Sequence, residues 1–113
     1  MAETLGKRIR RKREEKELGL REMARQLGIS PTYLSRVETD EEKTPPTEKT
    51  LDGIARLLGD DADELMYLAG RVPSDLSEMI KQDRTLPQFL RTARQHGLTG
   101  EELNTLLEKG KRK

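Results

Sequence analysis

Four polar side chains gather within five positions of this chain, and all of them form hydrogen bonds well: Thr32, Tyr33, Ser35 and Arg36. Hydroxyl groups both donate and accept hydrogen bonds, and a guanidinium presents a fixed fork of donors. On the outer side of one short helix, such groups match the edges of base pairs in a DNA major groove. The spacing therefore indicates a surface that could recognise nucleic acid.

Two short amphipathic segments would hold these side chains in place. The first has an apolar face made of Met23, Ala24 and Leu27. Gly28 ends this helix, because a residue without a Cβ adopts the left-handed conformation at little cost. Ser30 can cap the next helix, and Pro31 suits its first position. Leu34 and Val37 turn this second helix inward, and we predict a helix-turn-helix.

Composition and length limit what the rest of the chain can be. The 113 residues are 32% hydrophobic and 38% charged, which suggests one domain, or a small domain with an appendage, and a small core. Association with a second copy would supply further apolar contacts. We expect no membrane span, no signal peptide, and a cytoplasmic, nucleoid-associated location.

The inventory of reactive side chains argues against an enzyme. The chain has no cysteine and one histidine, His96, so a thiolate metal site is excluded and a catalytic role for His96 is not expected. The carboxylates at residues 60–64 lack the spacing of a calcium loop and fit helix capping better. We predict no cofactor and no metal.

Charge is distributed unevenly although the net charge is only +1. Residues 1–40 carry a net +3, residues 41–66 a net −5, and residues 67–113 a net +3. The densest basic stretch is KRIRRKR at residues 7–13. It fits either a DNA-facing patch or an ordinary solvated helix face.

Helical periodicity and capping residues predict an all-α chain. Five helices are expected at about residues 4–16, 20–27, 31–38, 47–58 and 61–69. The last of them would be capped by Asp60 or Asp61 and would bury Leu65, Leu68 and Ala69. We place a DNA-binding domain at residues 1–70 and a helical dimerisation or regulatory segment at residues 71–113.

Three further short helices are expected to begin near Ser74, Leu86 and Thr99, with fraying from Lys109 onward. Short helices cannot bury an apolar stripe alone. We therefore predict that they pack on the first five helices or, preferably, dimerise through their large apolar side chains. The residues concerned are Leu76, Ile80, Leu86, Phe89, Leu90, Leu103, Leu106 and Leu107.

The segment LGLREMARQLGISPTYLSRVE at residues 18–38 resembles the Cro/C1-type (xenobiotic-response-element) helix-turn-helix repressors. The matching positions are Ala24, Leu27-Gly28-Ile29-Ser30, Leu34-Ser35 and Glu38. The resemblance covers about residues 4–69. It implies a five-helix, lambda-repressor-like bundle that binds pseudopalindromic operators in double-stranded DNA as a homodimer, with residues 31–38 as the recognition helix.

The family reads bases from positions that here are Pro31, Thr32 and Arg36. Pro31 offers no hydrogen bond and would touch a thymine methyl or simply start the helix. Arg36 would bind guanine, or alternatively form a surface salt bridge or a phosphate contact. The full set implied to contact DNA is Leu20, Arg21, Ser30, Pro31, Thr32, Tyr33, Ser35, Arg36, Lys43, Thr44, Thr47 and Lys49.

Two departures and one match in the resemblance bear on the fold and the site. Leu20 replaces a polar residue, commonly Gln, so that its backbone N–H and Arg21 would meet the phosphate. Arg13 and Glu38 match a pair that forms an internal salt bridge in relatives. Residues 39–42 are acidic where relatives are basic or neutral; this loop either bulges away from DNA or weakens binding.

The C-terminal helices resemble the appendage of a subset of these regulators, in which AGRVPSDL is followed by a Leu-Pro-x-Phe-Leu-Arg segment. In that subset the appendage dimerises, and some members act beside a regulatory metallopeptidase. A second hypothesis makes the chain an antitoxin whose C-terminal helices bind a toxin protein. A third is an interaction module that does not bind DNA.

Overall fold

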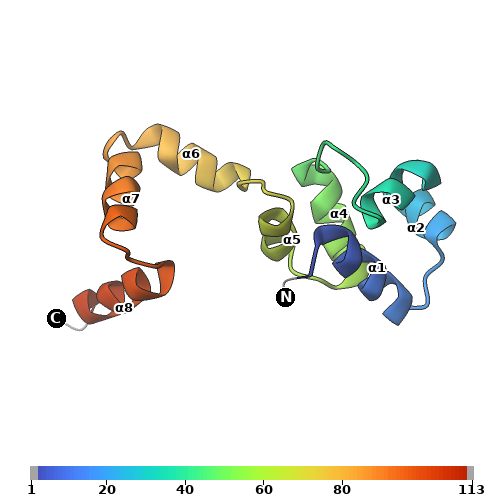
Figure 1. The fold of residues 1–113 in the computed structure, drawn as a ribbon, viewed down its shortest axis with the longest axis horizontal. Coiled ribbons are helices and arrows are strands. Elements are labelled where there is room, and N and C mark those ends of the chain that lie inside the picture. Colours follow the sequence, from blue (N-terminus) through green and yellow to red (C-terminus); the bar gives the residue numbers. More distant parts are fainter. Residues whose placement is uncertain (1–2, 112–113) are drawn as a thin grey trace. The chain divides into compact units, whose positions relative to one another are not determined.

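The computed structural model describes residues 3–111, which fold into helices joined by turns, with no strand among them. The helices are α1 Leu5–Glu15, α2 Leu20–Leu27, α3 Pro31–Glu38, α4 Glu48–Leu58, α5 Ala62–Leu68, α6 Ser74–Gln82, α7 Thr85–Gln95 and α8 Gly100–Lys111. Two compact units comprise Met1–Ser74 and Asp75–Lys113. The predicted all-α class is confirmed, and α1 to α5 form the five-helix bundle of the first unit (Figure 1).

Capping residues set most helix boundaries of the first unit. The hydroxyls of Thr4, Ser30 and Thr47 accept hydrogen bonds from the backbone N–H three residues later, at 3.2, 3.0 and 3.3 Å. Gly28 and Gly59 end α2 and α4 with φ angles of 71° and 65°. These interactions are local in sequence, which is why the bounds were predictable within one or two residues.

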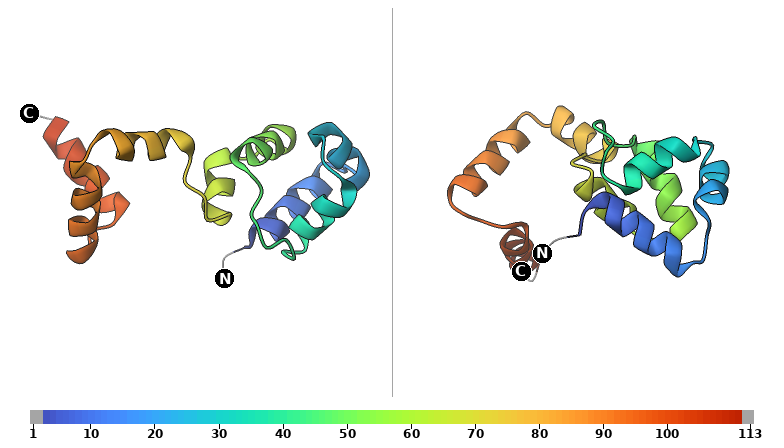
Figure 2. Two further views of the ribbon diagram at one scale, coloured as in Figure 1. Left: turned by 90° about the horizontal axis from the view of Figure 1, so that it is seen from above. Right: turned by 45° about the vertical axis from the view of Figure 1, so that its right-hand side comes forward.

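The core of the first unit takes buried side chains from all five of its helices, α1 to α5, whose arrangement Figure 2 shows. Its buried side chains are Ile9, Met23, Ala24, Leu34, Val37, Leu51, Ile54, Ala55, Leu58, Leu65 and Met66. The prediction for α5 is partly wrong, because Leu65 and Met66 are buried whereas Leu68 and Ala69 are only half-buried. The helix starts at Ala62, packs against α4 and turns its consecutive residues 65 and 66 into the core.

An ion pair ties α1 to the turn before α5. Arg8 Nε and Nη2 donate to the two carboxylate oxygens of Asp60 at 2.9 and 2.7 Å. The Asp60 side chain is only 3% exposed, and the Arg8 hydrogen bond lowers the pKa of this carboxyl to about 2. Asp61, not Asp60, caps α5, accepting from the N–H of Asp63 at 2.9 Å.

The chain between α5 and α6 is fixed to the first unit. The Arg71 guanidinium donates to the carbonyl oxygens of Pro45, at 2.7 Å, and Pro46. The Ser74 N–H donates to Glu48 Oε1 at 2.7 Å and lowers the pKa of that carboxyl. The first unit therefore extends through the junction at residues 71–73 that the sequence suggested.

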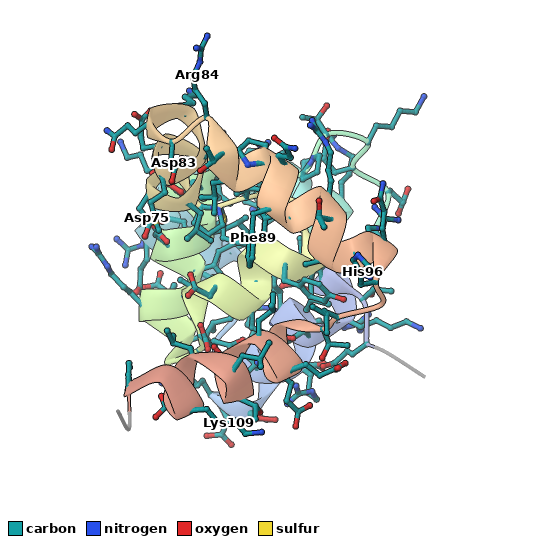
Figure 3. All side chains as sticks on the ribbon, turned by 90° about the vertical axis from the view of Figure 1, so that its left-hand side faces the viewer. Asp75, Asp83, Arg84, Phe89, His96 and Lys109 are labelled. Atoms are coloured by element: carbon teal, nitrogen blue, oxygen red, sulfur yellow. The ribbon has the colours of Figure 1, made fainter. Side chains whose placement is uncertain are left out.

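The second unit consists of α6, α7 and α8 and has almost no core of its own. Among its described residues, Ala93 is the one buried side chain. Phe89 lies on α7, and His96 follows that helix (Figure 3). Thr99 and Glu102 form the expected capping box, the Glu102 N–H donating to Thr99 Oγ1 at 3.1 Å.

Two details of the second unit differ from the sequence prediction. Helix α7 begins at Thr85 rather than Leu86, because the Asp83 carboxylate accepts from the Thr85 N–H at 2.9 Å. Helix α8 continues to Lys111 instead of fraying from Lys109; the rest of the tail lies outside the described residues. No helix within residues 3–111 is long and apolar enough to cross a membrane.

Candidate nucleic-acid interface

Helix α3 presents one apolar side and one polar side. Leu34 and Val37 are buried against the core. On the opposite side Thr32, Ser35 and Arg36 are exposed, and we refer to these three residues as the recognition ridge. Pro31 occupies the first position and is half-buried, and Ser30 caps the helix. The ridge therefore offers hydroxyls and a guanidinium on a rigid support.

A buried ion pair fixes the C-terminal end of α3 to α1. Arg13 Nε and Nη2 donate to Glu38 Oε2 and Oε1 at 2.7 and 2.9 Å. Arg13 Nη1 also donates to the Leu18 carbonyl at 2.8 Å. The Glu38 side chain is 3% exposed, and its hydrogen bond raises the pKa of Arg13. Both carboxylate oxygens of Glu38 are thus bound to Arg13. The pair is therefore structural and does not contact DNA.

Tyr33 and Leu20 belong more to the core than the sequence suggested. The prediction that Tyr33 lies outside is wrong in part, because its ring is half-buried and packs on the core. That burial, with the nearby Glu42 charge, raises the pKa of the phenol. The Leu20 side chain also packs on the core. Gly19 supplies no side-chain cap to α2, while Arg21 is exposed.

The acidic loop after α3 is held by four specific hydrogen bonds, which sequence reasoning missed. Asp40 Oδ1 accepts from the Gly6 N–H at 3.0 Å, and Oδ2 accepts from Thr4 Oγ1 at 2.6 Å. Glu41 Oε1 accepts from Thr39 Oγ1 at 2.7 Å. Glu42 Oε2 accepts from Arg36 Nε at 2.8 Å.

The consequence is that each loop carboxylate has its own partner within the protein. Asp40 takes a positive φ of 60° and places its carboxylate at the N-terminus of α1, where an anion is favoured. Beyond the loop, the side chains expected near phosphates are all exposed: Lys43, Thr44, Thr47 and Lys49. Thr47 Oγ1 also caps α4.

The arginines of the basic run of α1 are paired with carboxylates of the protein itself. Arg11 donates to Glu3 at 2.8 Å and to Glu15 at 2.9 Å, and Arg10 lies 3.5 Å from Glu14. The other two arginines of α1 are the ones already paired with Asp60 and Glu38. Of the two interpretations of this run, the structure supports a paired helix face over a DNA-facing patch. Within residues 3–111, no group of acidic or histidine side chains could hold a metal ion.

An all-α bundle with an exposed polar helix behind a glycine turn defines a helix-turn-helix protein. Residues 6–71 match the family described as "Helix-turn-helix domain", and the chain belongs to that family. It is a DNA-binding transcription regulator of the Cro/C1, or xenobiotic-response-element, type.

Individual relatives agree with this assignment. The chain is 46% identical over 61 residues to the "ImmF control region 10 kDa protein" of Bacillus phage phi105, over 54% of this chain and 66%, just under two thirds, of that protein. The biofilm regulator SinR, solved in complex with DNA, is similar at 28% identity, with a TM-score of 0.51 over 56% of this chain and 98% of that one.

The P22 c2 repressor, solved with a synthetic operator, shares the fold at 23% identity. Its TM-score is 0.52 over 57% of this chain and 94% of that one. These matches concern the first unit, and the lambda-repressor-like fold predicted for it is confirmed.

Proposed function

We propose that this regulator is a homodimeric repressor that binds a pseudopalindromic operator with α3 in the major groove. The observation that carries the proposal is the recognition ridge: Thr32, Ser35 and Arg36 are exposed on a helix whose other side is buried. Polar side chains at these positions suit the hydrogen-bonding edges of base pairs. A dimer bound over a promoter would repress by occupancy alone.

SinR, which is similar to the first unit, is solved in complex with DNA, and this supports a duplex as the ligand. The remaining predicted contacts would position the ridge through phosphates. The N-terminus of α2, with Leu20 and Arg21, would meet one phosphate through backbone N–H groups. The exposed Lys43, Thr44, Thr47 and Lys49 would meet another stretch of backbone near the start of α4.

The apolar side chains of the second unit support dimerisation. On α7, Leu86, Phe89, Leu90 and Ala93 recur at helical spacing, and Phe89 is 53% exposed. On α6 and α8, Leu76, Leu106 and Leu107 are 45%, 56% and 57% exposed, and Ile80 and Leu103 are half-buried. A second copy covering these faces would join two recognition helices in one dimer, as binding to two half-sites about 34–36 Å apart requires.

The same uncovered faces are the observation that favours the antitoxin hypothesis, in which they bind a toxin protein. A regulatory metallopeptidase is the third partner that we propose for them. Sedimentation of the full chain separates these proposals. A dimer at micromolar concentration supports the homodimeric repressor. A monomer that sediments as a complex only with a toxin supports the antitoxin.

DNA binding itself is tested by fluorescence anisotropy with the duplex upstream of the chain's own coding sequence. A dimer that touches about 6–10 phosphates should lose ~10³–10⁵-fold in affinity between about 50 and 200 mM salt. At a fixed salt concentration, the Arg36→Ala variant should bind this duplex more weakly than the wild-type protein does. Salt-insensitive binding, or equal binding of the variant, would contradict the proposal.

A further inference from the structure

A carboxylate from the following loop lies against the only arginine of the recognition ridge. Arg36 Nε donates to Glu42 Oε2 at 2.8 Å. Within residues 3–111, neither terminal nitrogen of this guanidinium makes a hydrogen bond. The terminal nitrogens therefore stay available as donors, and an arginine fork is what binds O6 and N7 of guanine.

The backbone of the loop holds Glu42 in this position. The N–H groups of Glu41 and Glu42 donate to the Arg36 carbonyl at 2.9 and 3.3 Å, so that the chain folds back over the end of α3. Asp40 makes the turn with its φ of 60° and fixes it to α1 through Gly6. Glu42 is thus placed by contacts that do not involve the Arg36 side chain.

The exposed fractions of the two side chains indicate that Glu42 holds Arg36 in place, and not the reverse. The Glu42 side chain is 23% exposed, whereas that of Arg36 is 49% exposed. A long arginine side chain on a surface helix samples many rotamers, and ordering it on binding costs affinity. A sheltered carboxylate bound to Nε restricts those rotamers before DNA arrives.

We propose that Glu42 is a specificity-determining residue, which aims the Arg36 guanidinium at a guanine in the major groove. The inference rests on the proposed function, because it requires α3 to enter that groove. The carboxylate also has a cost, since a negative charge near phosphates weakens binding to every sequence. Glu42 therefore exchanges general affinity for discrimination at one base pair.

Glu41 provides a matched control for this charge. It is a neighbouring carboxylate of the same loop, but its side chain accepts from Thr39 and not from the ridge. Glu41→Ala and Glu42→Ala remove the same charge from nearly the same place. Only the second removes the support of Arg36.

The experiment selects binders from a duplex library randomised over the span of two half-sites, using the full chain and its variants. We expect wild-type protein to enrich a guanine whose selection Arg36→Ala loses. At that position Glu42→Ala should lower the guanine preference by at least about fivefold, while Glu41→Ala leaves it unchanged. Both variants should bind unrelated DNA more tightly than wild type does.

Equal guanine preference in Glu41→Ala and Glu42→Ala would overturn the inference, because the carboxylate would then act only through its charge. A sharper preference in Glu42→Ala would also overturn it and would mean that Glu42 sequesters Arg36. Enrichment of a site without an Arg36-dependent guanine overturns the inference but leaves the proposed function standing. No enrichment by wild-type protein overturns both.

A second variant guards against collapse of the loop. Glu42→Gln is neutral and keeps an acceptor oxygen, so it should retain more of the guanine preference than Glu42→Ala does. Circular dichroism of each variant checks that the helices are intact. A Glu42→Gln variant that is folded yet no better than Glu42→Ala would show that the hydrogen bond to Nε is not the source of discrimination.

Discussion

At the scale of single residues, two arginines with the same chemistry have opposite surroundings. Arg13 is 12% exposed and bonds to a carboxylate that is 3% exposed. Arg36 is half exposed on the recognition ridge. Removing one partner of a buried pair leaves the other charge unpaired, whereas an exposed arginine contributes little to folding.

We therefore expect Arg13→Ala to lower the free energy of unfolding by about 3–5 kcal/mol. Arg36→Ala should change that free energy by less than about 0.5 kcal/mol and act on DNA affinity instead. Urea denaturation followed by circular dichroism measures both. A strongly destabilised Arg36→Ala variant would show that the ridge is part of the folded core.

Asp60 gives a prediction about pH. Because its carboxyl pKa falls from 3.8 to about 2 in the folded protein, its stabilising effect is present above about pH 4 and is lost as the pH falls toward 2. Asp60→Asn should cost about 2 kcal/mol of unfolding free energy at pH 7.

The measurement is denaturant unfolding of wild type and Asp60→Asn at pH 7, 4 and 2. The difference between the two proteins should shrink steadily across the acid range. Asp63→Asn, which changes an exposed carboxylate nearby, serves as the control and should show little difference at any pH. A constant gap for Asp60→Asn would mean that the Arg8 pair does not depend on ionisation.

Among these residues, contacts within one helix follow from the sequence and contacts between distant segments do not. The polar face of residues 32–36 could be predicted because helical spacing places it opposite Leu34 and Val37. The partners of Asp40 and Asp60 could not, since Gly6 and Arg8 lie 34 and 52 positions away in the chain. Tyr33 was misjudged because an aromatic ring at a helix edge can turn toward either side.

At the scale of helices, α1 comes very near the C-terminal end of α3 at Gly6. A Cβ at this position would lie 2.4 Å from the Val37 carbonyl oxygen and 2.6 Å from that of Glu38. Backbone oxygens cannot move aside as a flexible side chain can. Only glycine allows α1 to come this near, and the approach also aligns the Gly6 N–H with Asp40.

Gly6→Ala should therefore lower the free energy of unfolding by about 1–3 kcal/mol, although alanine normally favours a helix. Thermal unfolding of the full chain tests this. Gly110→Ala in α8, where a Cβ would meet nothing within 4 Å, is the matched control and should not lower stability. A stabilised Gly6→Ala variant would refute the close contact.

Helix positions were largely predictable, and helix packing was less so. Thr4, Ser30, Thr47 and Thr99 all cap helices through neighbours three residues away. Met66 was missed because α5 is short, and seven residues give too little periodicity to decide between residues 65–66 and 68–69. The need for glycine at position 6 could not be predicted from the sequence, because the backbone oxygens that exclude a Cβ there belong to another helix, α3.

At the scale of the whole molecule, the second unit needs a partner for its apolar side chains. Phe89→Asp places a charge in the proposed dimer contact and should convert the dimer to a monomer in sedimentation. Because two linked half-sites bind more tightly than one, operator affinity should fall as well. Gln88→Asp adds the same charge at an exposed neighbouring position and should leave the dimer intact.

The central claim is that two copies place α3 in successive major grooves through Arg36. Interference by guanine N7 methylation on a selected duplex tests it most directly, because N7 lies in the major groove. We predict that one methylated guanine in each half-site blocks wild-type binding, with the two centres about 10–10.5 base pairs apart, and that Arg36→Ala loses this sensitivity. Binding that ignores guanine N7 methylation, or that responds only to adenine N3 methylation in the minor groove, would contradict the claim.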